Sequence, residues 1–152
     1  MKQIPVREFM QRNPTTARAD MQLTELVSLF RQEGRRGLPV ADEGNRLVGV
    51  ISETDLFLKE HPVPFSTEKV PSLLGQVIDE QQVNQVERCK EMKVGEVMTE
   101  TTVSVDEETT LEETALLMYK RRLSMVPVVK DGLLSGVVRR SDILAILYRG
   151  DD

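Results

Sequence analysis

The chain has 152 residues, of which 39% are hydrophobic and 30% charged, a composition typical of a soluble globular protein rather than a disordered one. Its net charge of -5 argues against a general nucleic-acid binder, and its single cysteine excludes an intrachain disulfide and a cysteine-based zinc site. No apolar run approaches the roughly 20 residues that span a bilayer, and the start of the chain lacks a secretory signal. We therefore expect a soluble, cytoplasmic protein.

The sequence offers little for catalysis. It contains neither a phosphate-binding loop of the Gly-x4-Gly-Lys type nor a dinucleotide-binding Gly-x-Gly-x-x-Gly motif. A Cys–His pair could only be His61 with Cys89, and no signature surrounds either residue. We predict no enzyme and no metal site, while a small hydrolase or transferase that uses Cys89 or His61 stays open as a hypothesis.

The chain contains two copies of one unit. When the sequence is shifted by 88 positions, identical residues coincide in order, and after a one-residue gap at Asn45 they coincide again. The matched pairs are Val6/Val94, Glu8/Glu96, Met10/Met98, Leu23/Leu111, Glu25/Glu113, Leu29/Leu117, Pro39/Pro127, Val40/Val128, Gly44/Gly132, Gly49/Gly136, Val50/Val137 and Asp55/Asp142. This pattern indicates an internal duplication, with units at 4–59 and 94–149 and a linker between them.

Each copy predicts the same order of elements, which is an extended stretch, an amphipathic helix with an acidic start at Asp20 or Asp106, a β-hairpin and a second helix. In the second copy the helix carries a capping box at Thr109 and Glu112 or at Thr110 and Glu113. The extended stretches are Thr15–Arg18 and Thr102–Val105. The first hairpin joins Leu38–Ala41 to Leu47–Ile51, and the second joins Val126–Val129 to Leu133–Val138. The last helices begin near Ser52 and Arg139.

This order is βαββα, twice, which places the chain in the α+β class. A unit of about fifty residues buries too little apolar surface to be stable alone, so we expect the two units to pack sheet to sheet with pseudo-two-fold symmetry. The linker, residues 60–93, is too long for a plain connection, and an apolar stripe predicts one or two helices in it. Its role stays open between covering one end of the protein and contacting a partner.

The repeated residues resemble the tandem CBS-domain pair, also called a Bateman module. The resemblance is carried by Gly49-Val50-Ile51-Ser52-Glu53-Thr54-Asp55 and Gly136-Val137-Val138-Arg139-Arg140-Ser141-Asp142, with Leu38-Pro39-Val40 and Val126-Pro127-Val128 upstream and the openings Val6-x-x-x-Met10 and Val94-x-x-x-Met98-Thr99. It implies a regulatory, energy-sensing module rather than an enzyme, with an adenosine compound (AMP, ADP, ATP or S-adenosylmethionine) held between the two units. It also implies a homodimer and a separate, unknown regulated protein.

Specific residues acquire roles from this resemblance. Asp55 or Asp142 would accept hydrogen bonds from a ribose diol, while hydroxyl groups at the helix N-terminus would meet a phosphate. These hydroxyls belong to Ser52, Thr54 and Ser141. Apolar and threonine side chains would line the adenine, and the residues expected there are Leu38, Pro39, Val126, Pro127, Thr15, Thr16, Thr102 and Val103.

Two arginines are expected to contact a polyphosphate. Arg36 directly precedes the first hairpin, where the family often places a basic residue, and its equivalent in the second copy is Ser124. Arg139 stands where Ser52 stands in the first copy and departs from the hydroxyl usual in the family. A guanidinium suits a phosphate well, so we expect the two clefts to be inequivalent.

Helix capping is the competing explanation for the two aspartates, because Ser52-x-x-Asp55 alone is a pattern that starts a helix. Asp142 persists where the serine has become Arg139, which favours a ligand role. The main hypothesis is therefore an adenosine-compound sensor that signals through a change in conformation or dimer arrangement. The alternative is a structural or interaction module whose ligand sites have decayed.

Overall fold

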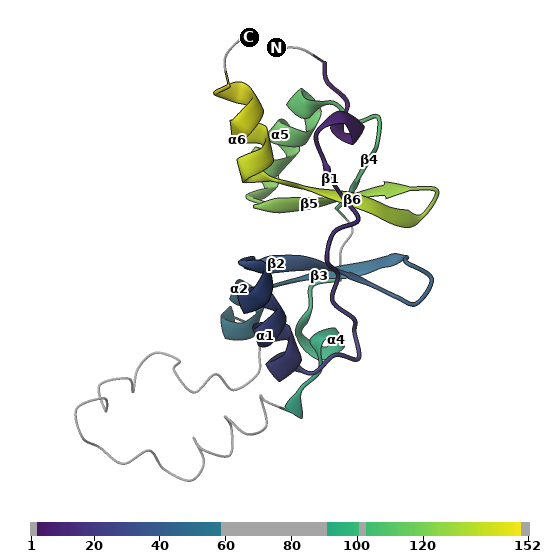
Figure 1. The fold of residues 1–152 in the computed structure, drawn as a ribbon, viewed down its shortest axis with the longest axis vertical. Coiled ribbons are helices and arrows are strands. Elements are labelled where there is room, and N and C mark those ends of the chain that lie inside the picture. Colours follow the sequence, from purple (N-terminus) through teal and green to yellow (C-terminus); the bar gives the residue numbers. More distant parts are fainter. Residues whose placement is uncertain (1–2, 59–90, 101–102, 150–152) are drawn as a thin grey trace, which may run out of the picture. The chain divides into compact units, whose positions relative to one another are not determined.

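The computed structural model describes residues 3–58, 91–100 and 103–149. In chain order its elements are η1 (Val6–Glu8, a 3-10 helix), β1 (Gln11–Arg12), α1 (Leu23–Glu33), β2 (Gly37–Ala41), β3 (Leu47–Ser52), α2 (Glu53–Leu58), α4 (Val94–Val97), β4 (Val105–Asp106), α5 (Leu111–Arg121), β5 (Met125–Lys130), β6 (Leu133–Arg139) and α6 (Arg140–Leu147). The predicted α+β class and the recurring helix, hairpin and helix are confirmed (Figure 1). His61, Cys89, Thr102 and the linker helices expected between 60 and 90 lie outside the described residues.

Two compact units are present, and they do not coincide with the two sequence copies. Unit 1 comprises Met1–Thr16, Pro39–Gly49 and Glu100–Asp152, and unit 2 comprises Ala17–Leu38 and Val50–Thr99. Each unit therefore combines the opening segment of one copy with the helices of the other copy. The hairpin of β2 and β3 is divided between the units: its central part, Pro39–Gly49, belongs to unit 1, and the two ends of the hairpin belong to unit 2.

Unit 1 is built on a four-stranded sheet in the order β1-β6-β5-β4. β5 and β6 form an antiparallel hairpin, whose turn residues Asp131 and Gly132 have φ angles of 53° and 81°. Two successive left-handed residues are typical of the tight turn that matches strand twist. Helices α5 and α6 lie on one face of this sheet (Figure 1). The apolar core of unit 1 consists of nine buried residues, which are Val6, Met10, Val105, Leu111, Met118, Val126, Val128, Val138 and Ile143.

The opening segment of the first copy completes unit 1. The Val6 amide donates to the Thr109 carbonyl at 2.8 Å, and the Leu111 amide donates to the Ile4 carbonyl at 2.7 Å. β1 then pairs antiparallel with β6. At the surface, the Arg7 guanidinium meets the Glu108 carboxylate at 2.8 Å, and this contact raises the pKa of Arg7. The segment thus satisfies the edge of the sheet that β6 would otherwise expose.

Unit 2 repeats this arrangement with the opening segment of the second copy. The Val94 amide donates to the Met21 carbonyl at 2.8 Å, and the Leu23 amide donates to the Met92 carbonyl at 3.0 Å. Val94 and Val97 of α4 are buried. The opening segments were recognised in the sequence as part of their own copies, but hydrogen bonding places each of them with the other copy.

The first helix of each copy begins later than its acidic residue predicts. α1 begins at Leu23 rather than at Asp20, and α5 begins at Leu111 rather than at Asp106. Asp106 instead closes a turn, because its Oδ1 accepts the amides of Glu108 and Thr109. The helix cap is Thr110, whose hydroxyl accepts the Glu113 amide at 3.1 Å. Of the two capping boxes in the sequence, the second is the one that forms.

The other local expectations differ from the structure at two places. In α1 the buried stripe is Leu23, Leu26 and Phe30, whereas Val27, predicted to share it, is 43% exposed. The stretch Thr15–Arg18 forms no strand of its own, whereas its counterpart supplies the short strand β4, which pairs parallel to β5. Among the described residues no helix is long and apolar enough to cross a membrane.

Gly136 provides a test of the pairing between β1 and β6. A Cβ at this position would lie 2.7 Å from both the Gln11 carbonyl oxygen and the Met10 sulfur, closer than packed atoms approach. We expect Gly136→Ala to lower the free energy of unfolding by about 2 kcal/mol, measured by urea denaturation, because β1 must shift away from β6. The control is Gly44→Ala, at an open turn position whose nearest neighbour is 3.5 Å away. Equal stability of the two variants would contradict the observed register.

Candidate functional site

Both of the candidate sites form where the last helix of a copy begins. In unit 2 the Glu53 amide, at the start of α2, donates to the Arg36 carbonyl at 3.0 Å. In unit 1 the Arg140 amide, at the start of α6, donates to the Ser124 carbonyl at 3.1 Å. The same hydrogen bond therefore ties the residue before each hairpin to the helix after it. In unit 2 it places the backbone of Arg36 beside the start of α2, the helix that carries Asp55.

Asp55 is enclosed by hydrogen bonds from its own unit. Its Oδ2 accepts the Ser52 amide at 2.9 Å and the Ser52 hydroxyl at 3.3 Å, and its Oδ1 accepts the Thr99 hydroxyl at 3.0 Å. The residue is only 9% exposed. A buried carboxylate with donors at both oxygens is stabilised in place. Asp55 therefore acts as a helix cap and as the acceptor that fixes Thr99.

Asp142 occupies the equivalent position in α6 with fewer contacts. Its Oδ2 accepts the Arg139 amide at 2.8 Å, and its Oδ1 has no hydrogen-bond partner within the described part of the chain. The residue is half-buried. The Arg139 side chain cannot complete a reciprocal cap, because a guanidinium carries no acceptor. As far as the described residues show, one carboxylate oxygen at the N-terminus of α6 can still accept hydrogen bonds.

The difference between the two aspartates follows from the exchanged opening segments. In unit 2, Thr99 pairs with Val50, and each residue donates its amide to the carbonyl of the other at 2.9 Å. In unit 1 the matching position is Gln11, which pairs with Val137. A threonine hydroxyl reaches the carboxylate, whereas no hydrogen bond from Gln11 to Asp142 is present in the described residues. The two candidate sites are therefore inequivalent in hydrogen bonding.

The remaining predicted site residues are divided between the two units. Leu38, Thr54 and Arg36 belong to unit 2. Those in unit 1 are Thr15, Thr16, Pro39, Val103, Val126, Pro127, Arg139 and Ser141. Leu38 and Val126, expected as walls for adenine, are 1% and 0% exposed and belong to the core. Arg36, Thr54 and Ser141 are exposed to solvent.

Thr99 contacts Asp55 but is not among the site residues that the sequence predicts. It was visible as the end of the opening Val94-x-x-x-Met98-Thr99, but the sequence assigns it to the second copy, 44 positions from Asp55. Only the exchange of opening segments brings it to the first copy's aspartate. As for metals, no group of three or more His, Cys, Asp or Glu side chains suited to an ion occurs in the residues described.

The fold and its sites define a class of protein: a duplicated α+β unit in which a carboxylate stands at the first turn of each last helix. A comparison with protein families identifies it further. The model of the CBS domain matches residues 6–60 and 94–149. The chain belongs to the CBS domain family and carries a tandem pair of such domains.

Several known proteins are similar along nearly their whole length. The uncharacterized protein MJ1426 of Methanocaldococcus jannaschii is 29% identical over 153 residues, which cover 93% of this chain and 90% of that protein. The crystal structure of CBSX2 in complex with AMP has a TM-score of 0.72 at 24% identity and covers 96% of this chain and 97% of CBSX2, an Arabidopsis thaliana protein. The CBS domain pair of MJ0100, solved with 5-methylthioadenosine and S-adenosyl-L-methionine, has a TM-score of 0.69 at 22% identity and covers 96% and 97%. The two solved structures establish the shared fold.

The hydrogen bond between Thr99 and Asp55 can be tested by stability. Thr99→Val keeps the shape of the side chain but removes the donor to a buried carboxylate, so we expect the free energy of unfolding to fall by about 1–2 kcal/mol. The matched control, Thr54→Val, alters an exposed threonine of α2 whose hydroxyl has no hydrogen bond to another described residue, and its effect should stay within about 0.5 kcal/mol. Urea denaturation of both variants measures the difference. If Thr99→Val were as stable as the control, the hydroxyl would not hold Asp55.

Proposed function

We propose that this protein is a cytoplasmic regulatory module that binds an adenosine compound, with its principal contact at the N-terminus of α6. The observation that carries the proposal is the hydrogen bonding of Asp142: one oxygen accepts the Arg139 amide, and the other accepts no hydrogen bond from the residues that the structure describes. An ionised carboxylate accepts up to about four hydrogen bonds, so this oxygen suits the two hydroxyls of a ribose.

Charge near Asp142 supports a phosphate beside the ribose. Arg139 directly precedes α6 and is half-buried, and Ser141 presents its hydroxyl in the first turn. The start of a helix favours an anion, because the first amides and the helix dipole are both positive there. Arg139 adds a guanidinium, which can bind two phosphate oxygens at once. AMP, ADP and ATP fit this arrangement, whereas S-adenosylmethionine has the ribose but a carboxylate in place of the phosphate.

Relatives of the same fold support the choice of ligand class. CBSX2 has been crystallised with AMP, and the MJ0100 pair with 5-methylthioadenosine and S-adenosyl-L-methionine. These ligands have an adenosine moiety in common. We extend the class to this chain because both of its copies have an aspartate at the matching position, Asp55 and Asp142.

The first copy is proposed as the weaker site. Asp55 already accepts three hydrogen bonds and is nearly buried, so a ribose must compete with Ser52 and Thr99 for the remaining lone pair. Arg36 would assist a polyphosphate there, since it is exposed next to the same turn. Binding at the Asp142 site would shift the conformation or the arrangement of a homodimer, and a separate protein would respond to that change. No catalytic role is proposed.

A second candidate function rests on a specific observation. Both aspartates accept the amide three residues earlier, which is the contact that caps a helix. If capping were their whole role, the protein would be a structural or interaction module without a ligand. The two candidates differ in one measurable respect, which is whether any adenosine compound binds at Asp142.

Asp142→Asn separates these functions. The amide side chain still offers one oxygen to the Arg139 N–H, so the cap is retained, but its NH2 group cannot accept from a ribose. We expect isothermal titration with AMP, ADP, ATP and S-adenosylmethionine to find at least one ligand with sub-millimolar affinity, weakened about tenfold or more in this variant. The control is Asp131→Asn in the β5–β6 turn, which should bind like the parent protein. Absence of binding to every compound would instead support the interaction module.

Arg139 gives a separate prediction about the phosphate. Arg139→Ala should weaken ATP about tenfold or more while changing the affinity for adenosine little, because only ATP has a phosphate for the guanidinium. Arg36→Ala should leave the Asp142 site unchanged, which makes it the matched control. Equal losses for ATP and adenosine in the Arg139 variant would show that Arg139 acts by supporting the helix start rather than by binding phosphate.

A further inference from the structure

Thr99 lies where the chain leaves one compact unit for the other. Unit 2 ends at Thr99, and unit 1 resumes at Glu100. Strand β3 crosses the same boundary, because Gly49 belongs to unit 1 and Val50 to unit 2. The two crossing points are joined directly, since Thr99 and Val50 each donate an amide to the carbonyl of the other at 2.9 Å. This bridge therefore restrains two of the connections between the units.

The opening segment that carries Thr99 is anchored unevenly along its length. Near its start, Val94 and Val97 are buried, and the Val94 amide donates to the Met21 carbonyl at 2.8 Å. At its end, Thr99 is exposed and is held by the isolated bridge to Val50 and by the bond from its hydroxyl to Asp55. An isolated bridge at an exposed position opens more readily than a packed segment. The hydroxyl bond therefore contributes much of what keeps this end closed.

The matching position in unit 1 does not lie at such a crossing. Gln11, the equivalent of Thr99, pairs with β6 inside the four-stranded sheet, and unit 1 continues beyond it as far as Thr16. A change at Gln11 would therefore act within one unit. A change at Thr99 would act on the connection between the units, so the two candidate sites differ in what they can transmit.

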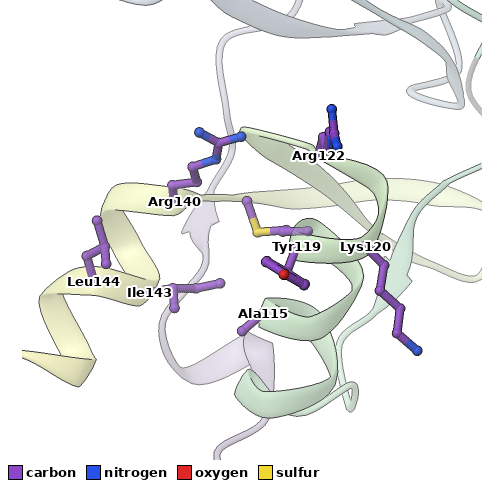
Figure 2. A pocket seen from close by; sticks show the side chains of 8 residues that line it. Ala115, Tyr119, Lys120, Arg122, Arg140, Ile143 and Leu144 are labelled. Atoms are coloured by element: carbon purple, nitrogen blue, oxygen red, sulfur yellow. The ribbon is translucent and has the colours of Figure 1, made fainter.

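The starts of the two last helices are braced by different groups. Figure 2 shows Arg140 at the start of α6, and its Nε donates to the Leu123 carbonyl at 3.0 Å. The matching residue of α2 is Glu53, whose carboxylate has no proton to donate to a carbonyl. In unit 2 the opening segment supplies a brace, through the Thr99 hydroxyl on Asp55. A group that replaced this hydroxyl would therefore act on the opening segment as well as on the helix.

We propose that Thr99 is a ligand-sensitive latch: a ribose diol that binds Asp55 displaces the Thr99 hydroxyl and loosens the connection between the units. This inference rests on the proposed function and assigns a regulatory role to its weaker site. Thr99 is exposed, so a ligand can reach the carboxylate oxygen that its hydroxyl occupies. Because one hydrogen bond must be given up for another, the latch opens at higher ligand concentrations than those that fill the Asp142 site.

Amide hydrogen exchange of the full chain, followed by NMR, measures the latch directly. The probe is adenosine, the moiety that all of the proposed ligands share. At saturating adenosine we expect the Thr99 and Val50 amides to exchange about fivefold or more faster, while the Val94 amide at the anchored end keeps its rate. Dideoxyadenosine, which lacks both hydroxyls of the diol, should leave these rates unchanged. The response should persist in Asp142→Asn, because it originates at Asp55.

Two substitutions of Thr99 separate a latch from a purely structural residue. Added to Asp142→Asn, Thr99→Val removes the competitor of the ribose, so isothermal titration should show adenosine bound about tenfold more tightly, although the same change lowers stability. Thr99→Ser keeps the hydroxyl and should bind adenosine as threonine does. The matched control is Thr24→Val, at an exposed position of α1 in the same unit, which should change neither binding nor exchange.

The possible outcomes distinguish the latch from the site on which it acts. If adenosine bound neither the parent chain nor any variant, the proposed function would fail and the latch with it. If adenosine bound but the Thr99 amide kept its exchange rate, the latch alone would be overturned. The same holds if Thr99→Val bound adenosine no more tightly than Thr99→Ser, because the hydroxyl would then not compete with the ligand.

Discussion

The structure depends on one constraint, which is that the opening segment of each copy must supply hydrogen bonds to the other copy. The last strand of a hairpin has an edge with unpaired amides and carbonyls, and an edge left open is costly and prone to aggregation. β1 covers that edge of β6, and Thr99 forms the equivalent bridge with Val50. Val6 and Val94, which anchor these two segments, are both fully buried. A single copy cut out at its sequence boundaries would therefore lack part of its own core.

This exchange also explains what the sequence could and could not reveal. The helices and hairpins follow from local patterns. The apolar spacing that begins at Leu23 and at Leu111 predicts the helices, and the two glycine-containing turns predict the hairpins. The contact between Asp55 and Thr99 joins residues 44 positions apart, and no local periodicity encodes such a pair. The helix starts were misplaced for a related reason. Asp20 and Asp106 are typical of helix N-termini, but Asp106 forms a turn four residues before the actual cap, Thr110.

The inequivalence of the two sites was predicted from Arg139, but its main physical source is elsewhere. The sequence drew attention to the residue that precedes each helix, Ser52 or Arg139. The structure shows that the hydrogen bonding of the aspartates differs chiefly through the exchanged partner, a threonine in one unit and Gln11 in the other. A short hydroxyl satisfies the buried carboxylate and competes with any ligand. Where it is missing, the carboxylate keeps an acceptor, and a ligand loses less by binding there.

The two copies share the same order of elements but differ in where their charged residues lie. At three matched positions the first copy has Gly34, Ser52 and Glu53, whereas the second has Arg122, Arg139 and Arg140. None of these changes alters an element, because the glycine conformation, the helix start and the bond to the residue before the hairpin all persist. What changes is the electrostatic potential around α5 and α6. Positive charge on the same scaffold attracts anions, which agrees with the second copy as the stronger of the two proposed adenosine sites.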